Sequence, residues 1–235
     1  MEFSFFKGAL WVLIRQMDWI ATGILLGLFF LSVICVAIMV FKYITFRAHR
    51  QSLQHLLQRI RYTKNFNELN AIGIDLQNTI GGRFIVKNVH ELKDILEHQV
   101  QGQGIETTNK KLTTQDIDNL EMASNQILDT ILLEEEAYLP ILGTSASASP
   151  LIGLFGTIWG LIHAFVDISQ EKSADIATVA PGMAEALIVT LAGLIVAIPA
   201  LVAFHYFTNE LRKIEAQLGT IQEIFVRLAQ HAFVK

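Results

Sequence analysis

The sequence is poor in charged residues and has almost no cysteine. Only 17% of its 235 residues are charged, and Cys35 is its single cysteine. One cysteine excludes an internal disulfide, so cysteine usage indicates no compartment. The net charge of −4 is nearly balanced and gives no sign of a nucleic-acid partner. With 52% hydrophobic residues and a mean hydropathy of +0.42, the chain is too apolar for an ordinary soluble domain.

Three long apolar runs account for this composition. Two of them contain no charged residue, and the third contains one carboxylate, Glu185. About 20 apolar residues are enough to cross the hydrocarbon core of a bilayer, so we expect three transmembrane helices. The first run is longer than the apolar part of a secretory signal and meets Lys42 instead of a cleavage site, so we interpret it as a retained span. The expected spans are 20–41, 139–166 and 184–207.

The distribution of positive charge predicts the orientation of these spans. Basic residues follow the first span and are balanced by acids before it. The positive-inside rule therefore places the N-terminus in the periplasm and the segment 42–138 in the cytoplasm. The remaining parts are then an aromatic-rich interfacial segment at 1–19, a short periplasmic connector at 167–183 and a cytoplasmic C-terminal helix at 208–235.

Apolar residues at helical spacing continue outside the spans. We expect the first span to extend as a helix beyond Phe41, loops at 78–82 and 101–108, and a helix capped by Thr114 that leads into the second span. The fold class predicted is therefore all-α: an integral membrane protein whose three transmembrane helices are extended by cytoplasmic helices. No metal-binding or cofactor-binding pattern is visible.

Glu185 is the most informative residue, because it is the one charged residue of its span. A charge at membrane depth costs about 3 kcal/mol on insertion scales, and such a residue usually faces a protein interior or a water path. It therefore indicates an ion or proton site. The alternative is that Glu185 lies at the interface and only marks the start of the helix.

Small residues and prolines in the second and third spans indicate close contact between helices. Glycines let helix backbones approach each other in lipid, and a proline frees a carbonyl that neighbouring helices must satisfy. Generic packing of a three-helix protein also explains the glycines well, but it does not explain Glu185. The predicted packing residues are Gly153, Gly156, Gly160 and Pro150 in the second span, and Gly193 and Pro199 in the third.

Thr157 and Thr190 are the next candidates for a polar path. Counted inward from the connector at about 1.5 Å per residue, both lie at similar depth in antiparallel spans. Glu185 and Thr190 are about 140° apart around an ideal helix, so a common path needs a neighbouring helix or subunit. A lone membrane threonine also commonly bonds a carbonyl of its own helix.

Two histidines and three serines in the spans are more simply interpreted as structural residues than as catalytic ones. His163 is expected to be an interfacial or packing residue, and His205 a structural one. An intramembrane protease would need a serine beside His163, but the serines lie about 20 Å along the span from it. No catalytic residue is therefore predicted; the serines considered are Ser145, Ser147 and Ser149.

Two segments carry a resemblance to a known family. The segments SPLIGLFGTIWGLIHAF (149–165) and VAPGMAEALIVTLAGLIVAIPA (179–200) resemble the second and third spans of the TolQ/ExbB/MotA proton-channel family. The resemblance covers roughly 139–207 and is weaker in the first span and the tail. The segment 65–115 has no recognisable counterpart. The stretch LPILGTSASASP (139–150), the histidine at 163 and the tail RLAQHAF (227–233) favour the TolQ branch over the ExbB branch.

The resemblance implies much of the expected function. Family members form a pentameric ring of three-span subunits around a dimer of single-span partners, TolR or ExbD, in the bacterial inner membrane. Proton flow turns this dimer and drives a transducer of the TolA or TonB type. Carried over by motif, Glu185, Thr157 and Thr190 form the proton pathway. A TolQ-like subunit would power the Tol–Pal system for outer-membrane integrity and division, and an ExbB-like one would energise TonB-dependent uptake of iron complexes or vitamins.

Two further hypotheses stay open beside the motor subunit and the intramembrane enzyme. A passive scaffold, in which Glu185 only anchors its helix, predicts that Glu185→Gln is silent. A self-sufficient ion channel predicts that the purified ring leaks protons without a partner.

Overall fold

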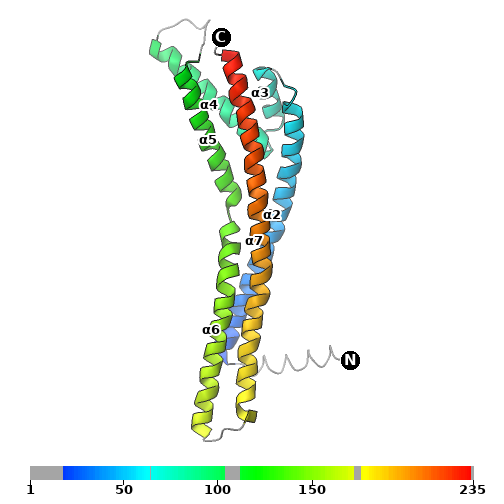
Figure 1. Ribbon diagram of the computed structural model, residues 1–235, viewed down its shortest axis with the longest axis vertical. Helices are drawn as coiled ribbons and strands as arrows, with labels where there is room; N and C mark the ends of the chain where they lie inside the picture. Colours follow the sequence, from blue (N-terminus) through cyan, green and yellow to red (C-terminus); the bar gives the residue numbers. More distant parts are fainter. Residues whose placement is uncertain (1–17, 64, 104–111, 172–175, 234–235) are drawn as a thin grey trace. The chain divides into compact units, whose positions relative to one another are not determined.

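The computed structural model describes residues 18–63, 65–103, 112–171 and 176–233, and these residues form helices and no strand (Figure 1). The all-α prediction is therefore confirmed. Part of the interfacial segment expected at 1–19 lies outside the described residues. The helices are α2 (Trp19–Ile60), α3 (Phe66–Asp75), α4 (Ile80–Gln103), α5 (Thr114–Glu136), α6 (Leu139–Glu171) and α7 (Ile176–Phe233).

The chain divides into two compact units, and the two longest helices contribute to both. The apolar unit comprises 1–41 and 138–206, and the amphipathic unit comprises 42–137 and 207–235. α2 runs without a break across residue 41, as the periodicity of the sequence predicts. Three helices of the described chain have the length and apolar composition needed to cross a membrane.

The apolar unit consists of α6, the first part of α7 and the first part of α2. α6 and α7 lie side by side and antiparallel (Figure 1). Many large apolar side chains on these helices are exposed, among them Phe29, Leu154 and Leu191. A contiguous apolar surface of this kind is typical of contact with lipid or with other protein chains.

The amphipathic unit packs one apolar face of each helix into a common core. α4 contacts both α3 and α5. Leucine and isoleucine at three- and four-residue spacing place their side chains on one helix face, which is why these segments bury a stripe and expose the rest. The largest fully buried side chains of this unit include Leu53, Leu56, Leu69, Ile80, Phe84, Leu92, Leu120, Ile131 and Phe225.

Local sequence explains where two of these helices begin. Thr113 caps α5 through a capping box: its hydroxyl accepts from the Asp116 N–H at 3.3 Å, and the Asp116 carboxylate accepts from the Thr113 N–H at 2.8 Å. The expected cap, Thr114, is wrong by one residue and is the first residue of the helix instead. At the start of α4 the Thr79 hydroxyl accepts from the Gly82 N–H at 3.2 Å.

Two expected loops are shorter in the structure. α4 begins at Ile80, so the last three residues of the loop expected at 78–82 belong to the helix. Gln101–Gln103 belong to α4, and the rest of the loop expected at 101–108 lies outside the described residues. Helices α6 and α7 also continue into the segment 167–183, which was expected to be a connector.

Tyr138 separates α5 from α6. Among the described residues it is the one non-glycine residue with a positive φ, at 72°. This left-handed conformation costs an ordinary side chain on the order of 1 kcal/mol. α5 ends at Glu136 and α6 begins at Leu139, on either side of this residue.

Candidate functional site

Glycine brings α6 and α7 into backbone contact. A Cβ atom at Gly153 would lie 3.0 Å from the Thr190 Cα, and one at Gly193 would lie 2.6 Å from the Ser149 carbonyl oxygen. A side chain at either position would therefore meet main-chain atoms, which have little room to move. The absence of a side chain on both helices sets their close approach in this region.

The other small residues of the second span lie on the same contact. Gly156 faces the Val189 side chain and approaches Ile24 of α2, and Gly160 faces Ala186. The two prolines differ from the glycines in their surroundings. Pro150 is half-buried within α6, whereas Pro199 of α7 is exposed on the single chain.

Thr157 and Thr190 bond adjacent carbonyls of α6. The Thr157 hydroxyl donates to the Leu154 carbonyl of its own helix at 2.7 Å. The Thr190 hydroxyl crosses from α7 and donates to the Gly153 carbonyl at 2.8 Å. The two hydroxyls are thus anchored within one turn of α6. Because a hydroxyl that donates one hydrogen bond keeps lone pairs that accept, both oxygens retain capacity for water or a proton carrier.

Glu185 lies in the third turn of α7 and meets the start of α2. Its carboxylate accepts a hydrogen bond from the backbone N–H of Asp18 and lies within Coulombic range of the Asp18 carboxylate. The side chain is partly buried in the single chain. Glu185 and Thr190 therefore contact different helices, as their angular separation on one helix requires.

Sequence reasoning missed Asp18, which lies directly before α2 and contacts residues of α6 and α7. One of its carboxylate oxygens accepts from the Trp19 N–H at 2.8 Å at the start of α2. The other accepts from the Trp159 indole N–H at 3.2 Å and lies 3.9 Å from His163 Nε2. The Trp159 and His163 rings pack with their centroids 5.2 Å apart. The acid is 167 positions from Glu185 in sequence, and no local pattern links them.

The serines of α6 bond to their own helix. The Ser147 hydroxyl donates to the Gly143 carbonyl at 3.1 Å, and the Ser149 hydroxyl donates to the Ser145 carbonyl at 2.6 Å. His163 instead contacts Asp18 and Trp159, so it forms no serine–histidine pair with Ser147 or Ser149. Over the described parts of the chain, no group of three or more histidine, cysteine or acidic side chains is arranged to hold a metal.

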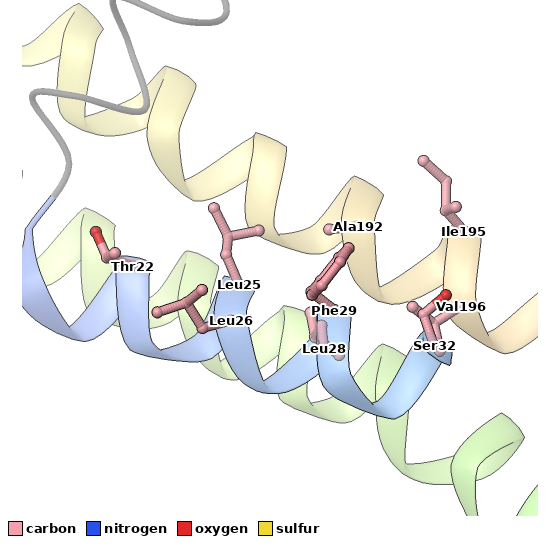
Figure 2. Close-up of a pocket in the computed structure, with 9 residues that line it drawn as sticks. All are labelled: Thr22, Leu25, Leu26, Leu28, Phe29, Ser32, Ala192, Ile195 and Val196. Atoms are coloured by element: carbon pink, nitrogen blue, oxygen red, sulfur yellow. The ribbon is translucent and has the colours of Figure 1, made fainter. Parts of the chain in front are cut away.

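An open apolar groove of about 750 Å³ runs between α2 and α7 (Figure 2). Its walls are aliphatic and aromatic apart from two hydroxyl residues, Thr22 and Ser32. Such a surface favours an acyl chain or an apolar helix over a polar ligand. The residues that line it are Thr22, Leu25, Leu26, Leu28, Phe29, Ser32, Ala192, Ile195 and Val196.

A charge cluster joins three helices of the amphipathic unit. The Glu135 carboxylate of α5 lies 3.1 Å from His49 Nε2 of α2 and 3.8 Å from the Arg83 guanidinium of α4. Arg83 also lies 3.5 Å from the Glu134 carboxylate. The buried Lys42 ammonium donates to the Glu135 backbone carbonyl at 2.6 Å.

The electrostatics of this charge cluster favour an ionised Glu135. Burial by itself raises the pKa of Glu135. The hydrogen bond from His49, with the positive charges of His49, Lys42 and Arg83, outweighs burial and holds the pKa below its ordinary value. The carboxylate therefore ties α2, α4 and α5 together in its charged form.

Comparison of the sequence with known protein families identifies one class, the membrane proton channels. The profile of the MotA/TolQ/ExbB proton channel family matches residues 79–220, which is more than half of the chain. The chain belongs to the MotA/TolQ/ExbB proton channel family. Family membership and the three apolar helices together point to a bacterial inner-membrane protein.

Individual relatives carry two names. The chain is 43% identical over 117 residues to the Tol-Pal system protein TolQ of Haemophilus influenzae, covering 49% of this chain and 50% of that protein. It is 52% identical over 73 residues to the Tol-Pal system protein TolQ of Pseudomonas aeruginosa, covering 31% and 32%. It is 26% identical over 214 residues to the biopolymer transport protein ExbB of Salmonella typhimurium, covering 91% and 83%. The chain thus matches about half the length of the first of these relatives.

Proposed function

We propose that this chain is a TolQ-like subunit of a motor driven by the proton motive force. It forms a ring, with five copies as the family resemblance implies, around a TolR-like dimer of single-span partners. Proton flow between ring and dimer powers a Tol–Pal system through a TolA-like transducer. The chain itself performs no covalent chemistry and needs no cofactor.

The observation that carries this proposal is Glu185, a carboxylate inside an apolar span that contacts a second acid, Asp18. An ionisable group at that depth is costly unless the protein uses it. One proton that crosses 100 mV supplies about 2.3 kcal/mol, so repeated crossings supply enough free energy to move a packed helix dimer in steps. Glu185 acts electrostatically where protons reach the surface that faces the partner.

Thr157 and Thr190 continue the path in this proposal. Both hydroxyls donate to adjacent α6 carbonyls, which fixes their oxygens and leaves their lone pairs available. They hydrate the path and pass protons toward an acidic residue of the partner. Because the remaining lining is apolar, the ring by itself conducts poorly and depends on the partner, which is the behaviour of a motor and not of an open channel.

The orientation proposed follows the positive-inside rule. Lys42, Arg47 and Arg50 follow the first span closely, so the amphipathic unit lies in the cytoplasm. The N-terminus and the α6–α7 connection lie in the periplasm, and the C-terminus lies in the cytoplasm. Glu185 and Asp18 then lie toward the periplasmic end of the spans, where protons enter under the proton motive force. Membrane lipid or a neighbouring copy covers the groove between α2 and α7.

A second candidate function is that of an ExbB-like subunit that energises TonB-dependent uptake. The match to the Salmonella ExbB favours it, because it extends over 91% of this chain, although at only 26% identity. Its ring would enclose an ExbD-like dimer and drive a TonB-like transducer. The two candidates share Glu185 and the proton path, and they differ in partner and phenotype.

The experiment that tests the proposal is Glu185→Gln at the native locus. Cells are scored for detergent resistance and for siderophore uptake, with protein abundance measured by immunoblot. Glu215→Gln is the matched control, because Glu215 is an exposed glutamate on the same helix in the amphipathic unit. The proposal predicts loss of detergent resistance in the Glu185 variant at normal abundance and no change in the control.

Other outcomes separate the alternatives. Loss of siderophore uptake alone would transfer the assignment to the ExbB-like candidate. Survival of both traits would leave a passive scaffold, in which Glu185 only anchors its helix. Labelling by a serine-directed fluorophosphonate would support the intramembrane enzyme, and the proposal predicts none.

A further inference from the structure

The Asp18 carboxylate does more than cap α2. One Asp18 oxygen accepts from the Trp19 N–H, the first N–H of α2, and this contact needs no second oxygen. The second oxygen faces Trp159 and His163 of α6. At the same time the Asp18 backbone N–H donates to Glu185 of α7. One residue thus connects the functional carboxylate to a titratable ring on another helix.

The three groups differ in exposure. The His163 side chain is 51% exposed and that of Asp18 is 31% exposed. Glu185, like Asp18, is partly buried. Histidine exchanges protons with water near neutral pH, and the gap of 3.9 Å between His163 Nε2 and the Asp18 oxygen is within reach through small motion or one water.

We propose that His163 and Asp18 form a relay that collects protons from the aqueous side and delivers them to Glu185. Trp159 positions Asp18 by its indole hydrogen bond and packs its ring against that of His163. The inference rests on the proposed proton-driven function and names residues of this chain that supply its site. Asp18 and His163 are positioning and transfer residues for Glu185, not sites of a separate activity.

The proton steps balance without any further reactant. An imidazolium at His163 gives its Nε2 proton to the Asp18 oxygen that lies 3.9 Å from it, which leaves a neutral imidazole and a carboxylic acid. The Asp18 acid then gives the proton to the Glu185 carboxylate and becomes a carboxylate again. His163 regains a proton from water. On the described residues of α2, α6 and α7 at this end, the titratable groups that take part are Asp18, His163 and Glu185.

The decisive variant is Asp18→Asn, because the asparagine carbonyl oxygen can still accept one of the two hydrogen bonds that the Asp18 carboxylate accepts from Trp19 and Trp159. It removes the proton affinity and loses one of these hydrogen bonds, because the amide NH₂ group cannot accept. Asp18→Glu retains a carboxylate, and His163→Gln retains a polar side chain without titration. Glu185→Gln reports on the proposed function itself, and His205→Gln is the control histidine, since His205 lies toward the other end of its span.

Cells with each variant are scored at external pH 6 and pH 8 for whichever trait Glu185→Gln abolishes. We expect Asp18→Asn and His163→Gln to lose activity about tenfold or more at pH 8, within the range of a single proton-transfer group. Activity recovers toward wild type at pH 6, because bulk hydronium then reaches Glu185 without a collector. Asp18→Glu and His205→Gln retain activity at both values.

If Asp18→Asn is as active as the wild type at pH 8 while Glu185→Gln is inactive, the relay is overturned and the proposed function stands. An active Glu185→Gln would instead overturn the proposed function. Equal loss by Asp18→Asn at both pH values would also count against the relay, because it would indicate a structural role.

A readout that does not depend on activity tests the coupling directly. In purified protein with Trp11→Phe and Trp19→Phe, the fluorescence of Trp159 reports the charge of the Asp18 carboxylate that it donates to. We expect the fluorescence to change with pH in the wild type and to stay constant in Asp18→Asn. The midpoint of this change should move in Glu185→Gln and in His163→Gln, because coupled groups titrate together. A midpoint that both substitutions leave unchanged would contradict the relay.

Discussion

The Thr190 hydroxyl of α7 donates to the Gly153 carbonyl of α6 at 2.8 Å, at a point where the two backbones are in contact. The hydrogen bond is possible because Gly153 has no side chain to hold the helices apart. The residue expected to belong to a proton path is therefore also a cross-link between two spans. A substitution at Thr190 affects packing and proton transfer together unless it is chosen to separate them.

Thr190→Val and Thr190→Ser separate these two effects. Valine has the shape of threonine without the hydroxyl, so the Gly153 bond is lost at a cost of about 0.6 kcal/mol, typical of interhelical bonds in membranes. Serine keeps the hydroxyl. We expect valine to abolish the trait lost in Glu185→Gln with only a small fall in the thermal midpoint in detergent, and serine to retain it. Full activity of the valine variant would exclude the hydroxyl from the path.

Gly193→Ala tests the close contact of α6 and α7. The added Cβ would lie 2.6 Å from the Ser149 carbonyl oxygen, and relieving this clash is expected to cost about 1–3 kcal/mol, as overpacking does. Gly23→Ala is the matched control within the apolar unit, since nothing lies within 4 Å of its added Cβ. Thermal midpoints in one detergent compare the two, and equal midpoints would show that the helices are not held this closely.

The charge cluster around Glu135 predicts an acid dependence of stability. Because the pKa of Glu135 is lowered in the folded protein, its contribution to stability is fully present above the ordinary carboxyl pKa of about 4.3. That contribution is lost as pH falls through the lowered folded value. Glu135→Gln should therefore lower the thermal midpoint at pH 7 and approach wild type as pH falls below 4.

Glu121→Gln is the control for this prediction, because Glu121 is an exposed glutamate on the same helix. In the Glu121 variant, the thermal midpoint should fall between pH 7 and acid pH by the same amount as in the wild type. A Glu135 variant whose midpoint stays the same distance below wild type at every pH would show that packing, and not charge, explains its effect.

Gly219→Ala is expected to stabilise the amphipathic unit. Gly219 lies inside α7 with nothing within 4 Å of an added Cβ, and alanine is favoured over glycine in a helix by about 1 kcal/mol. Gly82→Ala is the opposite case, because its Cβ would overlap the Leu76 carbonyl. Thermal midpoints should rise for the first variant and fall for the second, and a rise for both would show that the α3–α4 turn is looser than described.

The sequence predicted the helices well because hydropathy and periodicity are local properties. The spans and the continuation of α2 beyond Phe41 follow from the residues alone. The start of α7 differs from the expectation, because the segment 167–183 was expected to be a connector, whereas the helix begins at Ile176 and includes Pro181 in its second turn. The cap of α5 was misplaced by one residue because two adjacent threonines both qualify.

The site could be predicted only in part. Glu185 is conspicuous because charge is rare in an apolar span, but its contact with Asp18 joins helix ends that are remote in sequence. The charge cluster around Glu135 could not be predicted for the same reason, because its residues come from three helices that are remote in sequence. These residues are Lys42, His49, Arg83 and Glu135. A signal did exist in both cases: an acid directly before the first span, and a run of acids at 134–136 before the second. Deciding what each acid contacts requires the packed structure.

Proton flux through the reconstituted ring tests the central claim most directly. The purified protein is placed in liposomes with a pH-sensitive dye inside, with and without its single-span partner, and a potential is applied with potassium and valinomycin. The account predicts flux that requires the partner, that Glu185→Gln abolishes and that Glu215→Gln leaves intact. Equal flux without the partner, or undiminished flux in Glu185→Gln, would contradict it.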